Sequence, residues 1–83
     1  MAQQYNPTQN IKIRQAVLVF IKGSTAPLVL YVKEPQVFYN EMLELMKSAK
    51  PVLVEKETEG PIKKVCFAAN QVVALAIQEE QIL

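Results

Sequence analysis

Two stretches of the chain are apolar at every position. The first reads Ala-Val-Leu-Val-Phe-Ile from Ala16 to Ile21, and the second reads Val-Val-Ala-Leu-Ala-Ile from Val72 to Ile77. As strands, both would be apolar on two faces, because successive side chains of a strand point to opposite faces. A sheet with two apolar faces needs a layer over each, supplied by closure into a barrel or by another subunit. The pattern therefore indicates how the sheet is covered, either by its own closure or by assembly with another subunit.

The alternation of apolar and polar residues predicts further strands around these runs. Gly23 and Gly60 lie in the two clearest turns, where glycine supplies the backbone freedom that a tight reversal needs. The strands are expected at residues 11–21, 28–32, 52–57, 62–68 and 72–78.

One helix is predicted at residues 36–49. Its apolar positions follow the i, i+4, i+7, i+11 spacing of a single helical face. Pro35 suits the start of a helix, and Pro51 ends it. We interpret the apolar face as core. Its members are Phe38, Met42, Leu45 and Ala49.

The segment 71–81 allows two interpretations. Asn70 could cap a helix there, which would itself supply a missing layer, whereas the β-branched Val72, Val73 and Ile77 favour a strand. We adopt the strand. The predicted fold is then a single small α+β domain at 11–83, in the order ββαβββ, with a mostly antiparallel sheet and one helix packed on one face. Residues 1–10, rich in Gln and Asn, are expected to be a flexible tail.

The chain has 83 residues, of which 51% are hydrophobic. Small domains with excess apolar surface commonly share it with a partner. We therefore expect homo-oligomers or another protein partner, and a non-enzymatic assembly or adaptor role. The expected oligomer interface consists of Val17, Val19, Ile21, Val73, Leu75 and Ile77.

Candidate chemistry is sparse. The absence of histidine and the single cysteine exclude the common zinc sites and the Ser-His-Asp or Cys-His pairs, and two glycines do not make a phosphate-binding loop. Glu55, Glu57 and Glu59 are interpreted as a solvated strand edge, and Cys66 as a buried structural thiol. We predict no catalytic, cofactor-binding or metal-binding residues, and no enzyme.

The lone cysteine fits a reducing compartment, and the N-terminus lacks the pattern of a secretory signal. No apolar run approaches the roughly 20 residues of a membrane span. We expect a cytoplasmic protein without a membrane partner.

The formal net charge is +1, so nucleic-acid binding would need a local basic patch. Lys12, Arg14, Lys63 and Lys64 are the candidates. The alternative function is therefore an oligomeric nucleic-acid-binding regulator in which a ring repeats these residues. Lysines on strand edges also guard against aggregation, which is the interpretation that we favour.

Residues 26–80 resemble a family of small cyanobacterial proteins of ββαββ type. The shared features are Pro27-Leu28, the helix segment 38–44, a Leu-Val-Glu strand at 53–55 and the closing segment 70–78. The resemblance implies the strand-helix-strand architecture and brings no activity.

A second similarity is to the bacterial extracellular-matrix regulatory protein A family, which forms rings and binds DNA. It rests on Leu53-Val54-Glu55, Gly60, Lys63-Lys64-Val65 and the segment 74–80. That family carries arginines among the basic residues after the glycine, where this chain has Lys63 and Lys64. This similarity implies homo-oligomers and a nucleic-acid partner.

Overall fold

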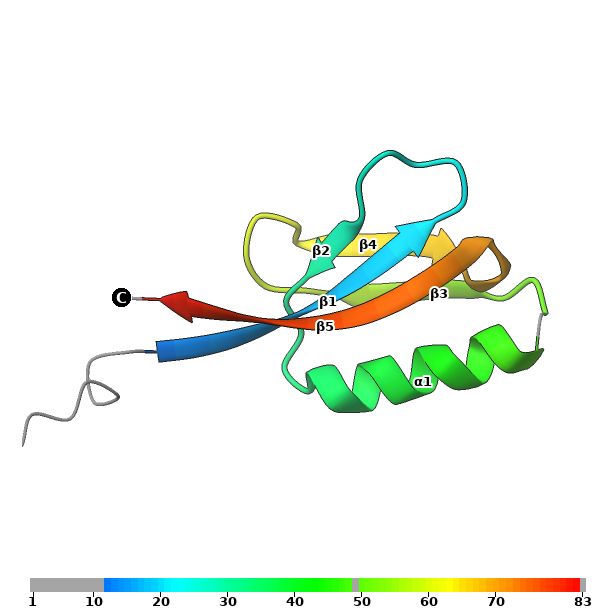
Figure 1. Cartoon of the computed structure of the whole chain (residues 1–83). Coiled ribbons are helices and arrows are strands. Elements are labelled where there is room, and N and C mark those ends of the chain that lie inside the picture. The colour runs from blue at the N-terminus through cyan, green and yellow to red at the C-terminus, as the bar shows by residue number, and fades with distance from the viewer. Residues whose placement is uncertain (1–11, 49, 83) are drawn as a thin grey trace, which may run out of the picture.

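The computed structural model describes residues 12–48 and 50–82. The tail predicted for 1–10, and Ala49 on the predicted helix face, lie outside the described residues. The elements follow the order ββαβββ, with a short 3-10 turn before the last strand (Figure 1). They are β1 (Lys12–Ile21), β2 (Leu28–Leu30), α1 (Pro35–Ser48), β3 (Leu53–Glu57), β4 (Lys64–Ala68), η2 (Ala69–Gln71) and β5 (Val72–Ile82).

The five strands form two antiparallel sheets. One has the order β2-β1-β5, and the other is the hairpin of β3 and β4. A single bridge from Tyr31 to Glu59, whose N–H donates to the Tyr31 carbonyl, links the end of β2 to the turn after β3. The predicted α+β domain with one helix and mostly antiparallel strands is confirmed, although the strands are divided three and two.

The strand predicted at 72–78 is present and extends to Ile82 as β5. β5 pairs with β1 from Lys12↔Ile82 to Ile21↔Val72, with one register shift between Phe20 and Ile21. Asn70 lies in η2 instead of capping a helix, and the Lys22 N–H donates to the Gln71 carbonyl. Ten residues of β1 give the β-branched side chains of β5 a pleated partner, which outweighs the helix propensity of its Ala, Leu and Glu residues.

The core lies between the three-stranded sheet, α1 and the β3–β4 hairpin. α1 begins at Pro35, and the Phe38 N–H donates to the Glu34 carbonyl. Phe38 and Met42, two of the predicted helix-face residues, are buried, with Leu45 packed against them. The buried cluster consists of Val17, Val19, Leu30, Val32, Phe38, Met42, Phe67 and Val72.

Candidate interaction surface

The strand registers divide the three-stranded sheet into two faces of different character. Val17 lies opposite both Leu30 and Ile77, and Val19 lies opposite Leu28 and Leu75. Directly opposed residues of antiparallel strands share a face. All six belong to the core cluster or pack against it, so this is the inner face, turned toward α1 and the β3–β4 hairpin.

The other face, which we call the outer face, carries the intervening residues. Leu18 lies opposite Val29 on one side and Ala76 on the other, and Phe20 lies opposite Ala74. Leu18, Phe20 and Val29 are only partly buried and none of them belongs to the core cluster of the described residues. Ala16, on the same face, is fully buried. An apolar sheet surface is therefore left without a packed layer among the described elements.

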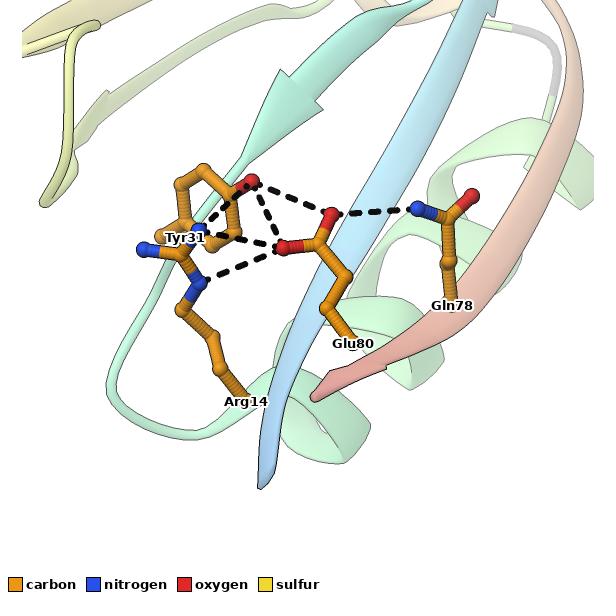
Figure 2. Close-up of polar contacts among 4 residues, drawn as sticks. All are labelled: Arg14, Tyr31, Gln78 and Glu80. Atoms are coloured by element: carbon orange, nitrogen blue, oxygen red, sulfur yellow. Dashed lines mark hydrogen bonds and ion pairs between the residues drawn. The ribbon is translucent and has the colours of Figure 1, made fainter. Parts of the chain in front are cut away.

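A polar cluster bounds the outer face at the end where β1 begins and β5 ends (Figure 2). Arg14 Nη2 lies 3.1 Å from Glu80 Oε1, and Arg14 Cζ lies 3.9 Å from the centre of the Tyr31 ring. The Tyr31 hydroxyl donates to Glu80 Oε1 at 3.1 Å, and Gln78 Nε2 donates to Glu80 Oε2 at 3.0 Å. This one carboxylate therefore joins β1, β5 and Tyr31, the residue that follows β2.

The cluster shifts the titration of its two weak acids. Partial burial alone would raise the pKa of Glu80, but hydrogen bonds from Arg14, Tyr31 and Gln78, together with the positive charge of Arg14, lower it below its ordinary value. Burial raises the pKa of Tyr31, as do its hydrogen bond to Glu80 and the charge of that carboxylate, against the opposing charge of Arg14. At neutral pH the cluster therefore holds an ionised Glu80 and a neutral Tyr31.

Glu80→Gln is expected to reduce the pH dependence of stability in acid. A lowered folded-state pKa contributes stability above the unfolded-state pKa and loses it as the pH falls through the folded-state pKa. The difference in free energy of unfolding between wild type and variant should therefore be largest near neutral pH and shrink on acidification. Urea denaturation across a pH series measures this. Glu79→Gln is the control, because Glu79 accepts a single side-chain hydrogen bond, from Gln15; equal effects of both substitutions would contradict the assignment.

The ring of Tyr31 leaves no room for a side chain at position 60, which is glycine. Gly60 has φ +84°, and a Cβ placed there would lie 2.8 Å from Tyr31 Cδ2, on a ring held by Arg14 and Glu80. Gly23 has φ +85° but open space around it. We expect Gly60→Ala to lower the free energy of unfolding by about 2–3 kcal/mol and Gly23→Ala by about 1 kcal/mol, since only the first adds a clash to the backbone strain. Denaturant unfolding measures both, and equal losses would show that Tyr31 moves away freely.

The predicted oligomer interface lies mostly on the inner face. Val17 and Val19 have 0% exposure, so neither is accessible to a partner of the folded chain. Ile21, Leu75 and Ile77 are partly buried and pack against the core. Val73 lies at the register shift, where it has no directly opposed residue on β1, and it is 60% exposed. The predicted interface did not include the outer-face residues, which are Leu18, Phe20, Val29, Ala74 and Ala76.

Cys66 is exposed, so its interpretation as a buried thiol is wrong. Val54 and Phe67 are directly opposed and turn inward, which leaves the opposed pair Glu55 and Cys66 on the solvent side of the hairpin. Glu55, Glu57 and Glu59 are exposed, in agreement with a solvated edge.

Two of the four candidate nucleic-acid contacts are paired with carboxylates of the same chain. Arg14 is bound to Glu80, and Lys64 Nζ lies 3.6 Å from Glu55 Oε2. Lys12 and Lys63 are exposed. Nucleic-acid binding stays a prediction.

A hollow beside the start of α1 is also rich in charged side chains. Lys56 Nζ lies 5.3 Å from the centre of the Phe38 ring, and glutamates from α1 and β3 line the same hollow. No group of three or more histidine, cysteine, aspartate or glutamate side chains within residues 12–48 and 50–82 is arranged to hold a metal ion. α1, the helix of the described chain, is not long and apolar enough to cross a membrane.

No protein-family model matches the sequence, and comparisons with curated proteins and with solved structures give no match. The two family resemblances stay predictions from the sequence. The candidate interaction surface is therefore the outer face, which combines partly exposed apolar side chains with the polar cluster at its end.

Proposed function

We propose that this protein is a non-enzymatic module that associates with further copies of itself through the outer face and serves in assembly or as an adaptor. The observation that carries the proposal is the partly exposed apolar surface of Leu18, Phe20 and Val29, which belongs to the sheet but not to the core. Contiguous apolar patches on small proteins mark interaction sites. The proposal includes a cytoplasmic location, because a single cysteine fits a reducing compartment.

The arrangement of the outer face supports this role. Its centre is apolar, while Arg14, Tyr31, Gln78 and Glu80 form a polar boundary at one end. Protein interfaces commonly combine an apolar centre with a polar rim. The surface is built on three paired strands, so association needs no rearrangement of the fold.

Thermal unfolding at several protein concentrations tests the proposal. Association of folded chains stabilises them by mass action, so the midpoint of unfolding should rise with concentration. For a domain of this size, a hundredfold rise in concentration above the dissociation constant should raise the midpoint by about 5 °C. A midpoint independent of concentration up to the millimolar range would rule out self-association as the function.

A further inference from the structure

We infer that two copies pack outer face to outer face about a two-fold axis, so that a ridge on each copy lies over a trough on the other. This inference rests on the proposed self-association and specifies its geometry. The ridge is defined as Leu18 and Phe20 of β1, and the trough as Ala74 and Ala76 of β5. The partner is a second copy of this chain.

The ridge and the trough are neighbours on one surface. Register places Leu18 opposite Ala76 and Phe20 opposite Ala74, so each large side chain stands beside a small one. Val29 continues the large side chains onto β2, opposite Leu18. The outer face is thus high along β1 and β2 and low along β5, and a flat partner would leave the trough unfilled. Close packing at interfaces requires the opposite relief.

A second copy supplies that relief by symmetry. In a two-fold interface, residue i of each subunit contacts residue j of the other. An axis parallel to the strands, between β1 and β5, places β1 of each copy over β5 of the other. Leu18 then lies over the partner's Ala76, and Phe20 over the partner's Ala74. Each pair occurs twice, and both ridges are covered.

The same axis matches charge. Arg14 on β1 is opposite Glu80 on β5, in the same relation as Leu18 to Ala76. The symmetry therefore brings Arg14 of one copy toward Glu80 of the other, so opposite charges face each other across the interface. Because Arg14 and Glu80 are already paired within each chain, self-association opposes no uncompensated like charges at this end.

Two complementary double variants test this geometry. The first removes the ridge with Leu18→Ala and Phe20→Ala, and the second fills the trough with Ala74→Leu and Ala76→Leu. Each alone should associate at least about tenfold more weakly than wild type, because the first leaves voids and the second overlaps large side chains. Mixed in equal amounts, they should form a one-to-one heterodimer, since the intact ridge of the second fits the open trough of the first and the truncated ridge clears the filled trough.

Native mass spectrometry and light scattering of the separate and mixed variants provide the readout. Circular dichroism checks that each variant folds, and the single substitutions Leu18→Ala and Ala76→Leu serve as a milder pair if a double variant does not. A mixture without heterodimer, beside a dimeric wild type, would overturn the ridge-and-trough geometry while leaving self-association intact. A monomeric wild type would overturn both.

Discussion

We expect Met42→Ala to lower the free energy of unfolding by about 2–5 kcal/mol, the range for truncating a fully buried large side chain. Met42 has 0% exposure in the middle of α1 and belongs to the cluster that joins the helix to both sheets. Its loss leaves a cavity in a domain too small to have much stability in reserve. Urea denaturation at one low protein concentration measures the effect without a contribution from association.

Met46→Ala is the matched control for this substitution. It removes the same atoms from the same helix, but Met46 is only partly buried and packs against the margin of the core. We expect a loss of about 1 kcal/mol. If Met42→Ala cost no more than Met46→Ala, the packing of α1 described above would be wrong.

If the proposed self-association is right, we expect Leu18→Lys to raise its dissociation constant by about a hundredfold, equivalent to about 2.7 kcal/mol. The substitution places a charge at the centre of the outer face, where association would have to remove it from water without a partner charge. Because Leu18 is partly exposed and outside the core cluster, the folded monomer should persist, as circular dichroism would show. Sedimentation velocity over a concentration series measures the change.

Val37→Lys introduces the same charge at another exposed apolar position. Val37 is 49% exposed on α1, away from the outer face. It should leave the dissociation constant within about threefold of wild type, since exposed substitutions remote from an interface have small effects. Equal weakening by both substitutions would move the cause from the outer face to net charge.

Much of the fold could be predicted from residue patterns. The helix from Pro35 to Ser48 follows from its apolar face and flanking prolines, and β5 follows from its β-branched residues. The division into two sheets could not be predicted, because alternation within a strand does not specify its neighbours. β2 was predicted at 28–32 but ends at Leu30. The next residue, Tyr31, forms an isolated bridge with Glu59 instead.

The candidate site shows where sequence patterns become ambiguous. In the run from Ala16 to Ile21 every position is apolar. Alternation therefore does not tell which of the two alternating sets of side chains faces the core. The interface predicted from the sequence used the set that contains Val17 and Val19, and the fold buries these two residues in its own core. A usable signal was present, since Arg14 shares its phase with Leu18 and marks that face as solvent-facing. The pairing of Arg14 with Glu80, 66 residues later, depends on strand register that no local pattern contains.

The two fully apolar runs lie side by side as β1 and β5. One of their faces is covered by α1 and the β3–β4 hairpin, and the other carries Leu18 and Phe20 outside the core. The requirement for a second layer therefore applies to the outer face alone. In the proposed dimer, a second copy covers this face without closing a barrel.

Sedimentation equilibrium of the wild-type chain tests this account most directly. The chain has a mass of 9.4 kDa. Self-association through the outer face predicts a weight-average mass that rises with concentration and levels off at twice that of one chain, because a two-fold face-to-face contact closes on itself. A mass that stays at 9.4 kDa into the millimolar range would contradict it.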